Sequence, residues 1–340
     1  MDTSDFDYDL PPGRIAQRPA VPRDAARLMA YDRASGRLAH HVFSDLPELL
    51  RPGDVLVVND TRVFPARLPM KKAASGGKAE LLLLHKLDPT TWEALAGGKG
   101  LRPGTELQAA AGPAATILRD LGGARRLVAF EEPIEPFLAQ IGQVPVPPYI
   151  HQVPEDPEDY QTVFAEPTGS AAAPTAGLHF TRALLARLQA GGIPAVALTL
   201  HIGLDTFAPV LEARPEDHVI HSEWCHISPE AAARLNQARA AGGRVVAVGT
   251  TAVRALETAA RATGGAPGVA PYTGSTNLYI LPGHEFRVVD ALITNFHLPR
   301  STLLALVSAF AGREQVLSLY HTAISKGYRF YSFGDAMLFT

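Results

Sequence analysis

The densest group of ligand-type side chains in the sequence lies between residues 218 and 226. It contains His218, His221, Glu223, Cys225 and His226. Imidazole, carboxylate and thiolate groups are the protein ligands that zinc prefers. Their spacing matches neither H-E-x-x-H nor a pair of C-x-x-C motifs, so the pattern favours an acid/base or polar-binding role for residues 221–223. We therefore expect no metal ion, and a metal-dependent hydrolase is the less favoured alternative.

Two other histidines occupy positions where ligands often bind. His179 lies at the end of the small-residue loop 173–180, and such loops let a ligand approach the backbone closely. His201 follows an expected strand, at the edge where open α/β sheets usually bind their ligands. The His179 imidazole could titrate near neutral pH. Taken alone, however, each histidine is more typical of a structural role.

Residues 245–254 are typical of a strand, a tight turn and the start of a helix. Gly249, Thr250 and Thr251 occupy the turn, where free backbone N–H groups and threonine hydroxyls could hold a carboxylate or a phosphate. The turn lacks the G-x-G-x-x-G and Walker A patterns, so it predicts neither a dinucleotide site nor a nucleoside triphosphate site. An ordinary helix N-cap explains the threonines about as well.

Polar and aromatic side chains are also mixed in two later segments. Residues 294–302 combine Asn295, His297 and an arginine just before an apolar helix. Residues 326–335 interleave aromatic rings with cations that include Lys326 and Arg329. This interleaving suits base stacking and phosphate contact, and an aromatic core strand is the alternative interpretation.

The elements that position these segments differ among three regions of the chain. An expected hairpin at 28–42 precedes an apolar strand at 55–58. From 63 to 146, short β-type runs separated by Gly and Pro clusters indicate a small antiparallel barrel or sandwich. After a Pro-rich hinge, helices and strands alternate, with helix starts at Thr181 and Ser228. We therefore predict an α/β fold, in which a large, discontinuous, mixed α/β catalytic domain (1–62 and 147–340) carries an inserted small antiparallel β-barrel domain (63–146).

Composition limits the partners that the chain can have. It has 340 residues, a formal charge of −3 and 46% hydrophobic residues. The longest apolar run, 303–312, is too short to span a membrane, and the N-terminus has no signal-peptide pattern. The single cysteine, Cys225, fits a reducing compartment, so we expect a cytoplasmic protein. The net charge argues against unselective nucleic-acid binding, but residues 62–78 carry no acid and the cations Arg62, Arg67, Lys71, Lys72 and Lys78.

The order of these segments closely resembles one family, the S-adenosylmethionine:tRNA ribosyltransferase-isomerases of queuosine biosynthesis. The resemblance runs from about residue 5 to residue 340. It rests on the collinear motifs at 59–68, 75–78, 147–150, 160–164, 173–180, 218–223, 248–257, 288–299 and 333–337.

The resemblance implies a transferase acting on tRNA. In that family, the ribosyl part of S-adenosylmethionine is transferred and isomerised onto 7-aminomethyl-7-deazaguanine at the tRNA wobble position. The products are epoxyqueuosine-tRNA, adenine and methionine. The family fold is a large mixed α/β domain with a β-barrel insertion. The implied partners are the tRNA and S-adenosylmethionine, which is a co-substrate, with no prosthetic group, no metal and no membrane. We expect a monomer, and a non-catalytic RNA-binding protein is the first rival interpretation.

Residue chemistry within the matching motifs suggests roles. Proton transfer is expected from the histidines His179, His201, His221 and His297. The carboxylates Glu223 and Asp335 are expected to orient them, and Asp335 could alternatively hold the substrate ammonium. Substrate binding is expected from Thr175, Gly177, Gly249, Thr250, Thr251, Arg254 and Asn295, where the turn at 249–251 and Arg254 could supply the partners of the methionine carboxylate. Contacts with tRNA are expected from Arg62, Arg67, Lys71, Lys72, Lys78, Lys326 and Arg329.

Overall fold

The computed structural model describes residues 1–152, 156–203 and 210–340. The chain forms two compact units. The large unit comprises Met1–Arg62, Pro148–Pro167 and Ala173–Thr340, and the second comprises Val63–Pro147 and Thr168–Ala172. The short segment 168–172 is thus grouped with the second unit, whereas we expected it in the large domain. It contains strand β11 (Thr168–Ser170), which pairs with β4 (Arg62–Val63).

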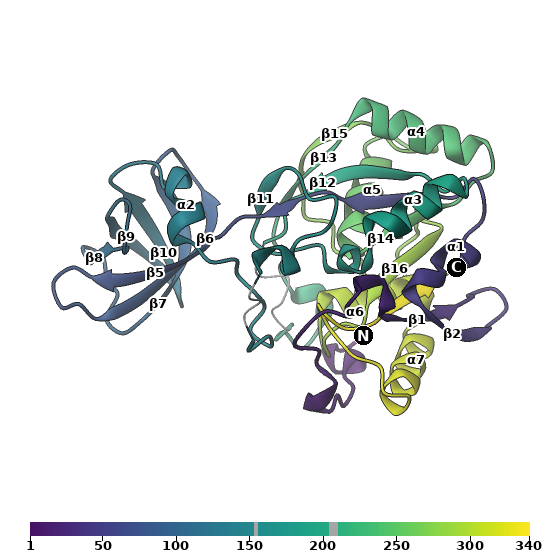
Figure 1. Cartoon of the computed structure of the whole chain (residues 1–340), viewed down its shortest axis with the longest axis horizontal. Helices are drawn as coiled ribbons and strands as arrows, with labels where there is room; N and C mark the ends of the chain where they lie inside the picture. The colour runs from purple at the N-terminus through teal and green to yellow at the C-terminus, as the bar shows by residue number, and fades with distance from the viewer. Residues whose placement is uncertain (153–155, 204–209) are drawn as a thin grey trace. The chain divides into compact units, whose positions relative to one another are not determined.

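The large unit is built on a mixed sheet of nine strands (Figure 1). The N-terminal strands join this sheet, as expected, and its central strands β3, β14 and β16 are buried along their whole length. Strands buried on both faces are typical of parallel sheets covered by helices. In spatial order the strands are β15 (Tyr272–Thr276), β13 (Glu223–Ile227), β12 (Ala195–Leu200), β3 (Val55–Asn59), β14 (Val245–Val248), β16 (Ala291–Asn295), β17 (Ala336–Phe339), β1 (Arg27–Tyr31) and β2 (Leu38–Val42).

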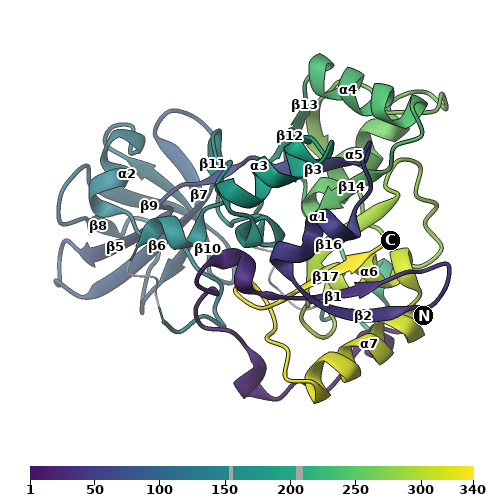
Figure 2. The same ribbon diagram turned by 45° about the vertical axis from the view of Figure 1, so that its right-hand side comes forward.

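Helices connect and cover these strands. Thr181 and Ser228 cap α3 and α4 by accepting N–H groups of the first turn, as the sequence predicted. In both views α4 lies at one end of the unit and α7 at the other (Figures 1 and 2). The helices are α1 (Leu46–Leu49), α3 (Arg182–Ala190), α4 (Pro229–Ala240), α5 (Thr250–Arg261), α6 (Thr302–Ala311) and α7 (Arg313–Ser325), with 3₁₀ helices η1 (Thr3–Phe6), η2 (Pro12–Arg14), η3 (Arg23–Ala25), η4 (Phe43–Asp45), η5 (Pro157–Tyr160), η6 (Thr175–His179) and η8 (Pro215–Asp217).

The second unit is a closed antiparallel barrel, so the barrel rather than the sandwich is confirmed. Alternate residues of each strand point inward and form its apolar core, for example Leu81 and Leu83 of β6. Its strands follow the order β10 (Arg125–Phe130), β7 (Thr91–Gly97), β6 (Lys78–Lys86), β5 (Arg67–Lys72), β8 (Glu106–Gln108) and β9 (Ala115–Gly122), and helix α2 (Glu135–Ile141) follows them.

Among the helices that the structure describes, none combines the length and apolar character needed to cross a membrane.

Candidate active site

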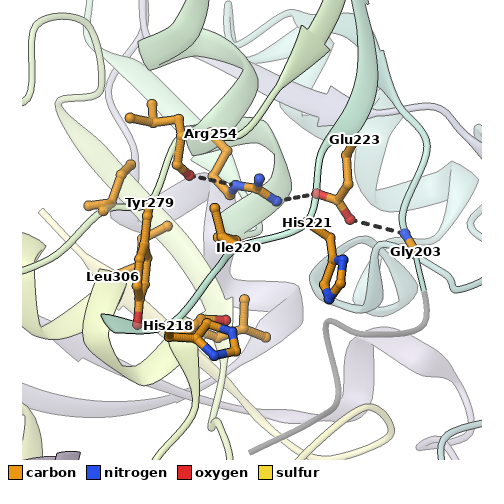
Figure 3. A pocket seen from close by; sticks show the side chains of 12 residues that line it. Gly203, His218, Ile220, His221, Glu223, Arg254, Tyr279 and Leu306 are labelled. Carbon is orange, nitrogen blue, oxygen red and sulfur yellow. Dashed lines mark hydrogen bonds and ion pairs between the residues drawn. The ribbon is translucent and has the colours of Figure 1, made fainter. Parts of the chain in front are cut away.

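Two small cavities of the large unit meet beside α5. The first, which we call the histidine pocket, is lined by Gly203, His218, Ile220, His221, Glu223, Arg254, Leu278, Tyr279, Ile280, Thr302, Leu303 and Leu306 (Figure 3). The second, the threonine pocket, is lined by Ala173, Pro174, Thr175, Ala176, Ile202, Gly249, Thr250, Thr251, Thr294, Asn295, His297 and Leu303. Leu303, near the start of α6, lines both, so the two cavities are neighbours.

A buried ion pair forms one wall of the histidine pocket. The Arg254 guanidinium of α5 pairs with the Glu223 carboxylate at the start of β13, and both side chains are less than a tenth exposed. The second Glu223 oxygen accepts the Gly203 N–H at 3.0 Å, and Arg254 Nε donates to the Leu278 carbonyl at 3.0 Å (Figure 3). Glu223 thus fixes α5 and the backbone at Gly203, while His221 lies beside it.

The opposite wall carries two further titratable groups. His218 Nδ1 lies 2.9 Å from Glu212 Oε2, and its ring meets the Tyr279 ring edge-on, with centroids 6.0 Å apart. Burial, with help from Glu212, raises the pKa of Tyr279 to about 12. Its hydroxyl is buried and has no hydrogen-bond partner among the described residues. Sequence reasoning missed Tyr279, although a tyrosine within the apolar run 278–281 already predicts a buried hydroxyl that needs a partner.

The threonine pocket is a polar cradle with apolar sides. Thr175 donates to Asn295 Oδ1 at 2.9 Å, and Asn295 Nδ2 donates to the Tyr331 carbonyl at 3.1 Å. Thr251 Oγ1 is buried and has no hydrogen-bond partner among the described residues. The pocket therefore brings together Thr175, Asn295 and the turn at 249–251, three segments that are far apart in the sequence.

His297 lies in the wall of the threonine pocket and is a poor candidate for proton transfer. Its Nε2 contacts Thr294 Oγ1 at 2.7 Å, and burial lowers the pKa of the imidazole to about 3. The ring is therefore neutral near pH 7 and a weak base there. We interpret it as a hydrogen-bonding group rather than the acid/base group that the sequence suggested.

His179 and Asp335 lie outside the two pockets and make structural contacts. The two ring nitrogens of His179 contact the carbonyls of Ala176 and Gly334, at 3.1 and 3.0 Å, and burial lowers the pKa of the ring. Asp335 accepts the backbone N–H groups of Arg27 and Arg329. These contacts join η6 and the N-terminal strand β1 to the segment before β17.

Gly177 also has a packing role. A Cβ at this position would lie 2.8 Å from the Phe164 ring and 2.9 Å from Thr162. The small residue is therefore required for close packing of η6, and Gly177 does not line either pocket.

The cluster at 218–226 is divided by its own strand. Side chains alternate between the two faces of β13, so Glu223 and Cys225 are buried while Trp224, 40% exposed, faces the other side. His201 and His226 stack on Trp224, with centroids 5.0 and 6.0 Å apart. His201 contacts Thr61 Oγ1 at 2.8 Å, and burial lowers its pKa.

The properties of Cys225 also argue against a metal site in the cluster at 218–226. Burial raises the pKa of the Cys225 thiol to about 11, which disfavours the thiolate that a metal would require. Within the described residues, no group of three or more His, Cys, Asp or Glu side chains is arranged to hold a metal ion.

The expected tRNA-binding cations are distributed over both units. In the barrel, Arg67 pairs with Glu80 at 3.0 Å, Lys72 Nζ donates to the Lys99 carbonyl, and Lys71 and Lys78 line a cavity of about 680 Å³. In the large unit, Arg62 pairs with Glu158. Arg329 lies 3.5 Å from Asp335, and the Lys326 carbonyl accepts a hydrogen bond from Arg27.

Comparisons with known proteins extend over the whole chain. A family model described as "Queuosine biosynthesis protein" matches residues 3–339. The chain is 54% identical to a protein of Symbiobacterium thermophilum and 51% identical to one of Moorella thermoacetica, in each case over 99% of both chains. Both are named S-adenosylmethionine:tRNA ribosyltransferase-isomerase. Among solved structures, the S-adenosylmethionine tRNA ribosyltransferase of Thermotoga maritima is similar, with a TM-score of 0.58 and 38% identity over 99% of this chain and all of the other.

Proposed function

Because the chain belongs to the family of queuosine biosynthesis proteins, we propose that it is an S-adenosylmethionine:tRNA ribosyltransferase-isomerase. We infer the finer reaction as well: transfer and isomerisation of the ribosyl group of S-adenosylmethionine onto 7-aminomethyl-7-deazaguanine at the wobble position of tRNA. The products are epoxyqueuosine-tRNA, adenine and methionine. With these substrates the reaction belongs in the cytoplasm.

The observation that carries this proposal is the pair of neighbouring pockets, one with titratable side chains and one with hydrogen-bond donors. The reaction removes a proton beside the sulfonium, expels adenine and lets a neutral amine attack. The sulfonium itself supplies the electronic activation, so the protein has to supply proton transfer and orientation. His221 and His218 line the first of these pockets, and imidazole is the side chain that most often transfers protons in general acid–base catalysis.

We assign proton transfer to His221 and positioning to the Glu223–Arg254 pair. Glu223 lies two residues after His221 in the chain, and its hydrogen bond with the Gly203 N–H fixes the backbone at Gly203, which also lines the pocket. The Tyr279 hydroxyl, protonated at neutral pH, can donate a hydrogen bond to substrate. None of these steps requires a metal or a redox cofactor.

The test is to incubate the protein with S-adenosylmethionine and tRNA that carries the precursor base. Adenine and methionine should appear together in equal amounts, and chelation with EDTA should not slow them. A non-catalytic RNA-binding protein would bind the tRNA without releasing adenine. No release by the folded protein, under conditions where a relative is active, would overturn the proposal.

A further inference from the structure

Helix α5 begins with backbone donors that no described side chain satisfies. Its N-cap is Gly249, which has φ +88° and makes no capping hydrogen bond, and the first bond of the helix runs from the Val253 N–H to the Gly249 carbonyl. The N–H groups of Thr250, Thr251 and Ala252 precede that bond, so they have no partner within the helix. Together with the helix dipole they favour a negative charge at this point.

A second, independent feature marks the same point. Thr251 is 93% buried, since only 7% of it is exposed, and its Oγ1 has no hydrogen-bond partner among the described residues although it lines the threonine pocket. A buried hydroxyl without a partner costs free energy, which a ligand oxygen at this position would offset. Gly249 itself has φ +88°, a backbone conformation that residues with a side chain rarely adopt, and a Cβ there would be in van der Waals contact with Thr251 Oγ1 at 3.7 Å.

The remaining walls of the pocket define the kind of anion. They are apolar at Ala173, Pro174, Ala176, Ile202 and Leu303, and none of the described residues that line them is a lysine or an arginine. The cavity volume is about 40 Å³, which corresponds to roughly three water molecules. These dimensions fit a carboxylate at the end of a short aliphatic chain. An RNA phosphate, which carries two ester links to the rest of the chain, fits this small cavity less well.

Arg254, the other group expected to hold a carboxylate, has its guanidinium committed elsewhere. It is bound by the Glu223 carboxylate and the Leu278 carbonyl, and it lines the histidine pocket rather than the threonine pocket. The structure therefore favours the N-terminus of α5 over Arg254.

We propose that the threonine pocket binds the methionine carboxylate of S-adenosylmethionine through the first N–H groups of α5 and the Thr251 hydroxyl. This inference rests on the proposed function and makes Thr251 a specificity-determining residue. The methylene groups of the methionine chain then lie against Ile202 and Leu303, and the sulfonium is directed toward the neighbouring histidine pocket.

Decarboxylated S-adenosylmethionine tests the proposal directly, because it keeps the sulfonium and the adenosyl group and lacks only the carboxylate. Adenine release is measured with both compounds at saturating precursor tRNA, and the decarboxylated compound is also measured as a competitive inhibitor. With the wild-type protein, kcat/KM for the decarboxylated compound should be at least about 100-fold lower than kcat/KM for S-adenosylmethionine, because several charge-assisted hydrogen bonds are lost. For the same reason, the inhibition constant of the decarboxylated compound should be at least about 100-fold higher than the KM for S-adenosylmethionine. Equal use of the two compounds would overturn the proposal while leaving the proposed function intact.

Variants then locate the site. Thr251→Val should weaken kcat/KM for S-adenosylmethionine by about 10- to 150-fold, the loss expected for one hydrogen bond to a charged group, and should leave the decarboxylated compound unaffected. Thr251→Ser keeps the hydroxyl and should restore activity. Thr322→Val, on α7, is the matched control because its hydroxyl donates to the Ser318 carbonyl one turn earlier.

Each contrary outcome has a separate meaning. Equal losses with both compounds, or an unchanged discrimination in Thr251→Val, would refute the assignment of the carboxylate to Thr251. Weaker tRNA binding with unchanged discrimination would identify the pocket as a phosphate site and also refute it. Absence of adenine release from the wild-type protein would instead count against the proposed function.

Discussion

Replacing Arg254 with Met should destabilise the large unit by about 3–5 kcal/mol. Arg254 and Glu223 are 8% and 5% exposed, so the variant removes the guanidinium that pairs with a buried carboxylate. Removal of one partner from such a buried pair typically costs this much, because the remaining charge stays desolvated. The variant also loses the hydrogen bond from Arg254 Nε to the Leu278 carbonyl.

A double replacement separates the loss of the pair from the loss of packing. In Arg254→Met/Glu223→Met both charges of the pair are removed from the interior, so much of the stability should return. The matched control is the pair of Arg187 and Glu48, whose side chains are 53% and 63% exposed. Arg187→Met should cost less than about 1 kcal/mol, as exposed pairs do.

The assay is equilibrium unfolding in urea with a signal from the large unit alone, because two units need not unfold together. Trp224 follows Glu223 in β13, and the other tryptophan, Trp92, lies in the barrel. A Trp92→Phe background therefore makes tryptophan emission specific to the large unit. If Arg254→Met costs no more than Arg187→Met, or if the double variant is less stable than Arg254→Met, the reasoning fails.

Three further predictions concern catalysis, pH and RNA. His221→Ala should lower kcat for adenine release by about 10²–10⁴-fold without changing the urea midpoint, whereas His321→Ala, at an exposed site of α7, should not. Because burial lowers the pKa of His297 to about 3, only the unfolded chain binds this proton between about pH 6.5 and 3. Stability should therefore fall as the pH drops through that range, by up to about 1.4 kcal/mol per pH unit, and His297→Gln should flatten the slope in urea titrations. Lys71→Ala/Lys78→Ala should weaken tRNA binding and reduce the slope of log K against log salt by about 1.8, and an unchanged slope would place the RNA elsewhere.

Local signals predicted the elements well, and long-range pairing was harder to predict. Thr181 and Ser228 could be recognised as N-caps because the cap needs only a hydroxyl and the N–H groups of the next turn. The choice between barrel and sandwich depends on which strands pair, and that is decided by contacts such as Arg67 with Leu82 and Lys72 with Leu107. No single strand carries that information.

The candidate site shows the same limit at the level of single side chains. His179 and Asp335 have residue types suited to proton transfer, but their partners are backbone groups from remote segments, namely Gly334 for His179 and Arg27 for Asp335. The sequence shows which groups could do chemistry and cannot show which have their hydrogen bonds satisfied. Thr251 and Tyr279 differ from them because burial leaves their hydroxyls without partners in the part of the chain that the structure describes.

The Glu223–Arg254 pair also explains how α5 can present an anion site only at its N-terminus. Thr251 and Arg254 are three residues apart, so they lie on neighbouring turns of one helix face, about 4.5 Å apart along the axis. An unpaired guanidinium there would compete for the carboxylate and draw it into the histidine pocket, where it would displace the sulfonium from the space beside His221. Glu223 pairs with that guanidinium, which leaves the helix N-terminus as the proposed site for the anion. The ion pair therefore acts on substrate position as well as on stability, and its loss should raise KM for S-adenosylmethionine even in variants that remain folded.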